Sequence, residues 1–418
     1  MTRDYEVVRD PLWDNIPLDQ VALAALDTPA VQRLRYVRQL GHAFLVYPGA
    51  THTRFEHALG AYHLTQRALA NLAARGELGR VDREVRRAVG LAALLHDIGH
   101  YPFSHGLEEA GFPSHEAMGV AMLGKGALGD LLRSLGGAEL VEEVGRLIRG
   151  KSKSPLQGLI SGTLDLDKID YLSRDARMCG VPYGTLDVDR LLSSLTLVPG
   201  PKQTSAVGIH EKGVSALESL LFAKYQMYRN VYWHHAVRSA TCMFKRAVRG
   251  AVRRGVVTEK GISALTDDAF MQLLIEQDQS EIATALRNRR LYKRALDLPA
   301  SEVPEAQDWV SDDTDLLEKV EDHLALEMGL KPGELLLDFP TRHNMLAVDL
   351  PLRLRDGSVD RLTSEGRAGH LGLPRIADEL YRSAQRLRVF VARPIRKKLA
   401  HVVDLVSQPA AAVRKQVG

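Results

Sequence analysis

Apolar residues recur at helical spacing along the first two-thirds of the chain. In Arg54–Ala74 they lie near every third or fourth position, which indicates an amphipathic helix. Glycines at Gly99 and Gly180 follow two further apolar segments, and glycine is common just beyond a helix end. The pattern therefore predicts helices over Thr28–Gln39, Arg54–Ala74, Arg83–Ile98, Leu164–Cys179 and, as one long buried helix, Glu218–Val248.

After about residue 330 the pattern becomes that of strands. Apolar and polar residues alternate over Met345–Arg355, and the proline at 351 favours an edge strand because it lacks a backbone N–H. Asp356-Gly357 is a strong hairpin signal, so Val359–Leu362 is expected to return as the partner strand. A strand over Leu387–Ala392 and a closing helix over Ile395–Val406 complete this region.

These elements predict a mainly α fold with a helical core and a smaller C-terminal α+β region. The acidic stretch Glu302–Asp315 suggests a junction between them. We therefore expect a helical core with an N-terminal extension over residues 1–300, a junction over 301–330 and the α+β region over 331–418.

Composition narrows the class of protein. Apolar residues make up 45% and charged residues 26% of 418 residues, as in ordinary globular proteins. The apolar runs are too short to cross a bilayer, and the N-terminus has no apolar stretch typical of a signal peptide. Only Cys179 and Cys242 are present, which excludes a disulfide framework, so we expect a cytoplasmic protein with no membrane partner.

The net charge of +3 does not by itself indicate a nucleic-acid-binding protein. Basic residues do cluster in Lys245–Arg254, Arg287–Arg294 and Arg386–Lys398. These clusters fit either solvated helix faces or sites for polyanions such as nucleotides. A nucleic-acid partner is thus allowed but not expected.

Histidine is distributed unevenly. Eight of the 15 histidines lie between His42 and His115, in less than a fifth of the chain. Histidine is the commonest metal ligand and the usual acid or base near neutral pH. The predicted Arg83–Ile98 helix closes on His96-Asp97, and a carboxylate in such an apolar setting requires a partner, which a metal ion can provide. The pair alone could also be a structural hydrogen-bonded pair.

Two other segments extend this pattern. Thr53-Arg54-Phe55-Glu56-His57 lies upstream, and Asp165-Leu-Asp167-Lys168 begins a segment downstream. Two imidazoles and two carboxylates suit a divalent ion such as Mn, Fe, Ni, Zn or Mg. Further along the downstream helix, Tyr171 and Asp175 share the face of Asp167, because the three are spaced four residues apart.

The His57, His96-Asp97 and Asp167 pattern resembles that of HD-domain phosphohydrolases. The longer strings Arg33–Gly41, Tyr47–His57, His96–His105 and Asp165–Asp175 resemble the deoxynucleoside triphosphate (dNTP) triphosphohydrolase family in particular, over about Val7 to Gly250. The resemblance implies hydrolysis of a dNTP to deoxynucleoside and inorganic triphosphate, with a divalent metal cofactor.

The resemblance also implies residue roles. The metal ligands would be His57, His96, Asp97 and Asp167. The catalytic group would be His105, Glu108 and His115, with His115 as the acid. Substrate would contact Gln39, Leu40, Arg54, His100, Lys168, Tyr171, Asp175, Lys224 and Tyr232. The family departs from this chain at Glu108, where a relative has Asp, and at Lys224, where a relative has Arg and so a bidentate contact.

A guanine-nucleotide activating site is a further implication, carried by Asp27, Gln32 and Arg35. Such a site forms between subunits in relatives, so it implies a homo-oligomer, either a tetramer or a dimer. A capped helix with an exposed glutamine and arginine is the alternative. Two other functions also stay open: an HD phosphodiesterase or nucleotidase acting on other nucleotides, and a non-catalytic nucleic-acid-binding or regulatory HD protein.

Overall fold

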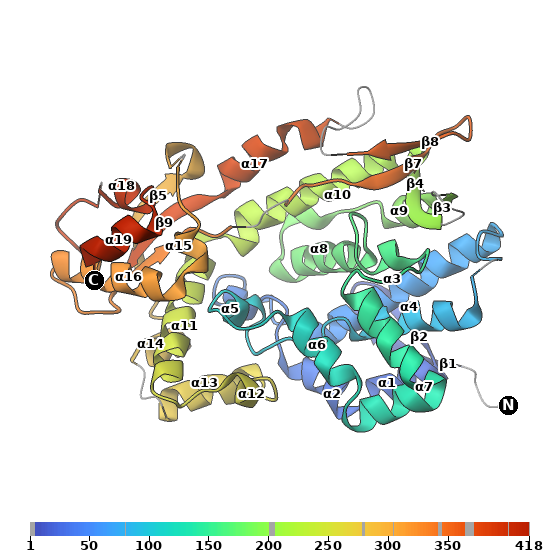
Figure 1. Cartoon of the computed structure of the whole chain (residues 1–418), viewed down its shortest axis with the longest axis horizontal. Helices are drawn as coiled ribbons and strands as arrows, with labels where there is room; N and C mark the ends of the chain where they lie inside the picture. Colours follow the sequence, from blue (N-terminus) through green and yellow to red (C-terminus); the bar gives the residue numbers. More distant parts are fainter. Residues whose placement is uncertain are drawn as a thin grey trace.

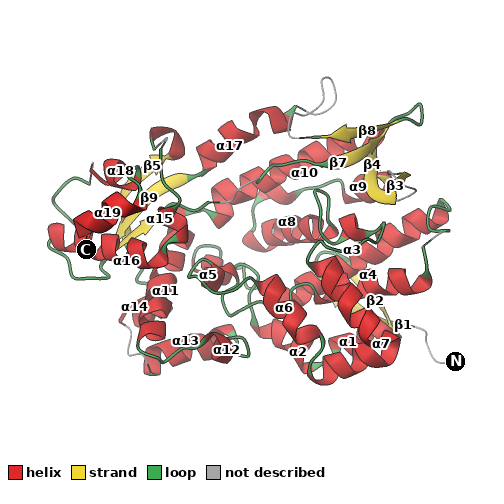
Figure 2. Cartoon of the chain, in the orientation of Figure 1, coloured by secondary structure: helices red, strands yellow, loops and turns green. Residues whose placement is uncertain are grey.

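The computed structural model describes residues 5–79, 81–199, 205–277, 281–303, 305–341, 345–363, 372–399 and 401–417. Helices dominate these ranges, and the prediction of a mainly α fold is confirmed (Figure 2). Within them, no helix combines the length and the apolar character that a membrane crossing requires.

The first two-thirds forms a helical body (Figure 1). Most of its helices pack around one large apolar core, whereas Leu107 and Phe244 belong to a second apolar core. The helices α3, α4 and α8 lie at its centre, where α3 packs against both others. Its helices are α1 (Gln20–Leu26), α2 (Pro29–Gln32), α3 (Arg54–Ala74), α4 (Arg83–Leu95), α5 (His105–Glu108), α6 (His115–Leu123), α7 (Gly126–Ile148), α8 (Leu166–Cys179), α9 (Val188–Ser194), α10 (Val214–Met227) and α11 (His235–Arg253).

Local capping explains where the central helices begin and end. Thr53 and Glu56 form a capping box, so α3 begins at Arg54 as predicted and carries His57 on its first turn. The Asp165 side chain accepts from the Lys168 backbone N–H at the start of α8. Gly180 ends α8 in the left-handed conformation, with φ at 68°. The predicted helices at these positions are confirmed to within a few residues.

The predicted helix over Thr28–Gln39 is wrong beyond Tyr36. A short α2 and a 3₁₀ turn over Arg33–Tyr36 replace it, and Val37 is extended. Tertiary pairing explains the difference, because Arg54 N donates to Val37 O and Gln39 N donates to His52 O. Residues 37–39 therefore lie beside the start of α3.

The single long helix over Glu218–Val248 is also wrong. It is interrupted between α10 and α11 by a π-helical turn, Tyr228–Tyr232. His234 then caps α11, accepting from the Ala236 backbone N–H at 3.3 Å. Such π-turns occur often at functional sites, and this one directs Tyr232 toward α8.

Three sheets accompany the helices. A hairpin of β1 (Tyr5–Asp10) and β2 (Asp14–Asp19) begins the described chain. A second sheet has the order β3-β4-β7-β8, and a third has the order β5-β9-β6. Their strands are β3 (Leu195–Pro199), β4 (Ser205–His210), β5 (Lys293–Pro299), β6 (Leu335–Asp338), β7 (Leu350–Arg353), β8 (Val359–Leu362) and β9 (Arg386–Val391).

The predicted C-terminal hairpin is confirmed, since β7 and β8 pair antiparallel across Gly357, whose φ is 86°. The expectation that Pro351 marks an edge strand is wrong, because β7 lies between β4 and β8. Pairing with β4 begins only at Leu352, so this ladder does not require a proline N–H. The strand also covers only Leu350–Arg353 of the predicted Met345–Arg355.

A separate apolar core holds the C-terminal elements together. The helices α15 (Trp309–Asp312) and α16 (Thr314–Glu327) pack there against the third sheet. The range predicted as a junction therefore contributes residues to this core. The domain boundaries expected from the sequence stay a prediction. The closing helix predicted over Ile395–Val406 is shorter in the structure, where α18 covers His401–Val406. A further helix, α19 (Ala410–Val417), follows it. The remaining helices are α12 (Glu259–Ile262), α13 (Asp267–Glu276), α14 (Glu281–Arg287) and α17 (Ala377–Ala384).

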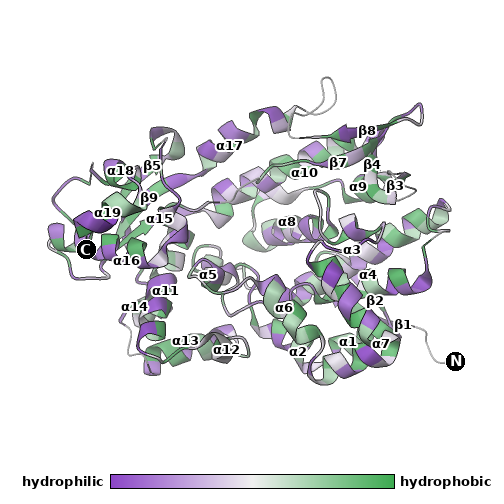
Figure 3. Ribbon diagram, in the orientation of Figure 1, coloured by the Kyte–Doolittle hydropathy of each residue, from purple (hydrophilic) through white to green (hydrophobic). Residues whose placement is uncertain are grey.

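Hydrophobic and hydrophilic stretches alternate along most of the longer helices (Figure 3). This is the arrangement expected where one helix face packs on a core and the other meets solvent. The exceptions to this rule identify the site, because several charged side chains of α3 and α8, and that of Asp97 just beyond α4, are buried.

Candidate active site

One large cavity of about 870 Å³ opens between the helical body and the C-terminal elements. Polar and charged side chains line it from α3, α5, α8 and α11, and from His96 and Asp97 just after α4. Residues of α15 and β6 add a further wall. Among the predicted site residues it is lined by Gln39, Leu40, Arg54, His96, Asp97, His100, His105, Glu108, His115, Asp167, Tyr171, Asp175 and Tyr232.

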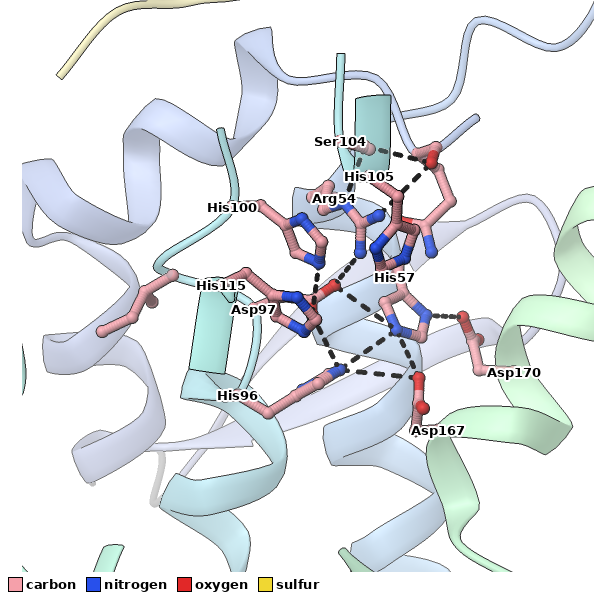
Figure 4. Close-up of polar contacts among 12 residues, drawn as sticks. Arg54, His57, His96, Asp97, His100, Ser104, His105, His115, Asp167 and Asp170 are labelled. Atoms are coloured by element: carbon pink, nitrogen blue, oxygen red, sulfur yellow. Dashed lines mark hydrogen bonds and ion pairs between the residues drawn. The ribbon is translucent and has the colours of Figure 1, made fainter. Parts of the chain in front are cut away.

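The four predicted metal ligands converge at one point of this site (Figure 4). The Nε2 atom of His57 lies 3.2 Å from Nε2 of His96 and 2.8 Å from Oδ1 of Asp167. Nε2 of His96 lies 3.4 Å from Oδ1 of Asp97 and 3.5 Å from Oδ1 of Asp167. These donor atoms come from α3, from the C-terminal end of α4 and from α8, and together they could hold one divalent cation.

Electrostatics support this interpretation. Burial alone would lower the pKa of His57, but the hydrogen bonds that its ring donates to Asp167 and Asp170 raise it to about 10. Burial would raise the pKa of Asp167, yet contacts with His57 and His96 hold it well below its usual range. The carboxylates thus stabilise a positive charge between them, and a cation can take the place of the proton.

Asp170, which the sequence did not single out, orients the candidate ligand His57. Nδ1 of His57 lies 2.7 Å from Oδ2 of Asp170, whose side chain is fully buried. Metal-binding histidines usually direct their second ring nitrogen to a carboxylate in this way. The spacing of Asp170 three residues after Asp167 was the available signal, since such residues share a helix face.

Arg54 neutralises the other side of Asp97. Its Nη1 atom lies 2.5 Å from Oδ2 of Asp97, and its Nε donates to Ser104 Oγ. Phe103 and Ser104 both have positive φ, at 58° and 56°. Non-glycine residues adopt this conformation at a cost, and such strain is concentrated at active sites. The strained turn aims the Ser104 hydroxyl at Arg54.

The residues of the predicted catalytic group form one connected hydrogen-bonded cluster. Glu108 Oε1 lies 2.6 Å from Nδ1 of His115, and its Oε2 lies 2.9 Å from Nδ1 of His105. Burial raises the pKa of Glu108, but the two imidazoles hold it well below its usual range. The rings of His100 and His115 stack at 3.7 Å, and Nε2 of His115 is 3.8 Å from Asp97 Oδ1. The cluster therefore adjoins the metal ligands.

The predicted sugar-binding residues line the same cavity. Asp175 accepts from the Tyr232 hydroxyl at 2.7 Å and contacts Nε2 of His52 at 2.7 Å. Gln39 is buried, and within the described residues its Oε1 has no hydrogen-bond partner. A buried amide oxygen at a cavity wall is suited to a ligand hydroxyl or amine. His52 was not predicted, and no short motif indicates its role.

The structure separates two of the predicted phosphate contacts from the rest. Arg54 and His100 line the main cavity, but Lys168 and Lys224 line a neighbouring cavity of about 190 Å³. Lys168 Nζ is bound to Asp165 Oδ2 and to the Gly162 carbonyl, both at 2.6 Å. Neither lysine lines the main cavity, where the cationic side chains are instead Arg54, Arg238 and Lys245.

The residues predicted to bind an activating nucleotide do not line the main cavity. Arg35 Nε donates to Gln32 Oε1 at 2.8 Å, and the Arg35 guanidinium covers the Phe55 ring at 3.6 Å. Arg35 and Asp27 are exposed. The arrangement is a short polar patch on the surface around α2.

The sequence did not indicate a role for the C-terminal region, and the structure shows that it reaches the site. Arg238 of α11 is buried and binds both Glu109, at 2.8 Å, and Asp338 of β6, at 2.7 Å. Glu109 directly follows Glu108. An ion pair thus joins the catalytic cluster to the third sheet, and sequence reasoning missed it because the partners are 129 and 100 residues away.

Comparisons with known proteins agree with this geometry. Residues 54–175 match the family model described as HD domain, and residues 186–402 match the model described as HD associated region. The first match begins at Arg54 and ends at Asp175, so it spans the converging ligands, while the second covers more than half of the chain.

The match to each curated relative covers only part of that relative's length. The uncharacterized protein MJ1154 of Methanocaldococcus jannaschii is 35% identical over 73% of this chain and 62% of its own. The deoxynucleoside triphosphate triphosphohydrolase SAMHD1 of Gallus gallus is 27% identical over 69% of this chain and 55% of its own. The chain therefore spans less than two thirds of these relatives.

Among solved structures, a phosphohydrolase of Bacteroides thetaiotaomicron has the same fold. Its TM-score is 0.72 at 22% identity, and the match covers 93% of this chain and all of the other. At 22% sequence identity, this similarity shows a shared fold and nothing more specific.

Proposed function

The chain belongs to the HD-domain family and carries its HD-associated region, and on this basis we propose that it hydrolyses dNTPs to deoxynucleoside and inorganic triphosphate. The observation that carries the proposal is the adjacency of two groups in one cavity. The convergence of His57, His96, Asp97 and Asp167 lies beside the cluster of His105, Glu108 and His115. The SAMHD1 relatives, named for this activity, add support.

The ligand set fits a divalent cation, and when bound this cation would supply Lewis-acid polarisation of the phosphoryl group under attack. His57 and His96 would provide neutral ring nitrogens, and Asp97 and Asp167 would provide oxygens. Mn, Fe, Ni, Zn and Mg are all compatible with this set.

The chain's own residues would carry the proton transfers. His115, held by Glu108 on Nδ1, would donate a proton from its Nε2 to the departing 5′ oxygen. His105, held by the other oxygen of Glu108, would accept a proton from the attacking water. Arg54 and His100 would contact the phosphates, with Lys168 and Lys224 contributing charge from the adjoining cavity.

The nucleoside end would be bound by other residues that line the same cavity. Tyr171, Asp175 and Tyr232 would contact the deoxyribose, together with Gln39 and Leu40. The buried side-chain oxygen of Gln39, Oε1, supports this, because it has a lone pair available for a ligand donor.

Activation by a guanine nucleotide at Asp27, Gln32 and Arg35 is a further part of the proposal, with a homo-oligomer as its setting. The exposure of Asp27 and Arg35 supports it, because a bound nucleotide or a second subunit could reach them. The free thiols Cys179 and Cys242 support the predicted cytoplasmic location.

Product analysis is the decisive experiment. Purified protein with Mn²⁺ would be incubated with each dNTP, and the products separated by ion-exchange chromatography. We expect deoxynucleoside and triphosphate in equal amounts. Stepwise release of orthophosphate would instead support an HD nucleotidase, hydrolysis of cyclic or dinucleotide substrates alone would support a phosphodiesterase, and nucleic-acid binding without turnover would support a regulatory protein.

A further inference from the structure

We propose that the N-terminal hairpin of β1 and β2 is a working part of the metal centre, because its Trp13 and Asp10 position the ligand His57 through Asp170. The inference rests on the proposed metal site. It concerns positioning residues, which do not touch substrate or metal themselves.

Asp170 is the point at which the hairpin meets the ligand. Its Oδ2 lies 2.7 Å from Nδ1 of His57, and its Oδ1 accepts from Nε1 of Trp13 at 2.5 Å. Trp13 lies in the turn of the hairpin, 157 positions away in sequence. The indole N–H therefore holds one carboxylate oxygen while the other faces the imidazole.

Asp10 acts on the same carboxylate through an arginine. Arg174 donates to both oxygens of Asp170, at 2.9 and 3.0 Å, and its Nη1 donates to Asp10 Oδ2 at 2.8 Å. The side chains of Arg174, Asp10 and Asp170 are at most 3% exposed. A buried arginine between two carboxylates has little freedom to move, so it fixes the plane of Asp170.

Asp10 also closes the turn of the hairpin. Asp10 Oδ1 accepts from the backbone N–H groups of Leu12 and Trp13, at 2.9 and 2.8 Å. One carboxylate thus sets the turn that carries Trp13 and also binds Arg174. Changing the turn should therefore change the position of both contacts to Asp170.

Helix α3 packs closely against the Asp170 carboxylate at Gly60. A Cβ atom at Gly60 of α3 would lie 1.8 Å from Asp170 Oδ1 and 2.6 Å from Arg174 Nη2. The carboxylate is thus pressed between α3 and the hairpin. Its orientation depends on contacts that the metal ligands alone do not supply, which is why the hairpin residues should affect metal affinity.

The test measures metal binding directly. Trp13→Phe keeps an aromatic ring but removes the N–H, and Asp10→Asn keeps the shape but removes the charge. The matched control is Trp309→Phe, since Trp309 is also an indole donor, to the Gln408 carbonyl at 2.9 Å, but in the C-terminal core. The dissociation constant of Mn²⁺ would be measured by chelator competition, and the Co²⁺ form by its visible spectrum.

We expect Trp13→Phe and Asp10→Asn to weaken Mn²⁺ binding about tenfold, the lower end of effects seen for residues behind metal ligands, and to alter the Co²⁺ spectrum. Trp309→Phe should bind Mn²⁺ as the wild type does. Wild-type affinity and spectrum in folded Trp13→Phe or Asp10→Asn, judged by circular dichroism, would overturn the inference. A wild-type protein that binds no cation would instead overturn the proposed function.

Discussion

Nδ1 of His115 lies 2.6 Å from Oε1 of Glu108, and this contact leaves Nε2 of His115 directed at the metal ligands, 3.8 Å from Asp97 Oδ1. Glu108 binds His105 with its other oxygen. One carboxylate therefore orients two imidazoles beside the point where the substrate phosphate is proposed to lie. This relationship gives the first prediction.

Replacing His115 by alanine should lower kcat for dNTP hydrolysis by about 10²–10⁴, the range for loss of a general acid or base. Glu108→Gln should lower kcat less, because the imidazole remains. Metal content, measured by inductively coupled plasma mass spectrometry, should stay at the wild-type value in both. His401→Ala is the control, because the His401 side chain is exposed at the start of α18. A His115→Ala enzyme with unchanged kcat would remove His115 from the catalytic group.

Loss of a metal ligand should remove metal and activity together. His96→Ala and Asp97→Ala each delete one donor from the convergent set, and a catalytic cation with an incomplete set binds more weakly. Prolonged dialysis against a chelator should likewise remove metal and activity from the wild type. Added Mn²⁺ should then restore turnover in the wild type but not in the two variants. If either variant keeps full metal content and the wild-type rate, the assignment of that ligand is wrong.

Asp338→Asn should destabilise the protein in a pH-dependent way. Burial raises the pKa of Asp338, but Arg238 outweighs this and holds the pKa below its usual value. The ionised carboxylate therefore contributes stability above the unfolded-state pKa of about 3.9, and this contribution is lost as the pH falls further. Breaking a buried pair costs about 3–5 kcal/mol, so a deficit of that size is expected at pH 7.

Urea denaturation between pH 7 and pH 3.5 would measure this deficit, which should shrink at the acid end of the range. The control is Asp349→Asn, since Asp349 pairs with Arg361 on the surface. There the change in free energy of unfolding should stay within about 0.5 kcal/mol. A deficit in Asp338→Asn that is constant with pH would show that the lost stability is not electrostatic.

The surface patch near α2 gives the fourth prediction. Added GTP or dGTP should raise the rate of dATP hydrolysis several-fold in the wild type and not in Arg35→Ala, because Arg35 would supply the charge that binds the phosphates. Arg133→Ala, another largely exposed arginine, should respond as the wild type does. Equal rates with and without the guanine nucleotide would count against this site and against the oligomer that it implies.

Much of the helical body could be predicted from the sequence because its signals are local. The capping box at Thr53 and the glycine at 180 depend on neighbours within a few residues, and α3 and α8 appear where these signals lie. The hairpin at Gly357 follows from the same kind of local chemistry. The convergence of His57, His96, Asp97 and Asp167 could be expected because the motif matches a known family.

The errors arise where distant contacts outweigh local preference. Residues 37–39 leave the predicted helix because they pair with residues 52–54, and α10 and α11 separate at a π-turn that brings Tyr232 to Asp175. Pro351 lies inside a sheet because β4 pairs only beyond it. None of these contacts has a signature in a single segment.

Residue types and their order along the chain thus indicated the chemistry proposed for this protein, a histidine-rich set of candidate metal ligands beside a carboxylate with two imidazoles. Tertiary structure decided which residues support that chemistry. Only the fold brings Trp13 and Asp10 to Asp170, binds Arg238 to both Glu109 and Asp338, and sets Lys168 and Lys224 on a neighbouring cavity. The physical reason is that buried charges must find partners, and the nearest partner in space is often more than 100 residues away in sequence.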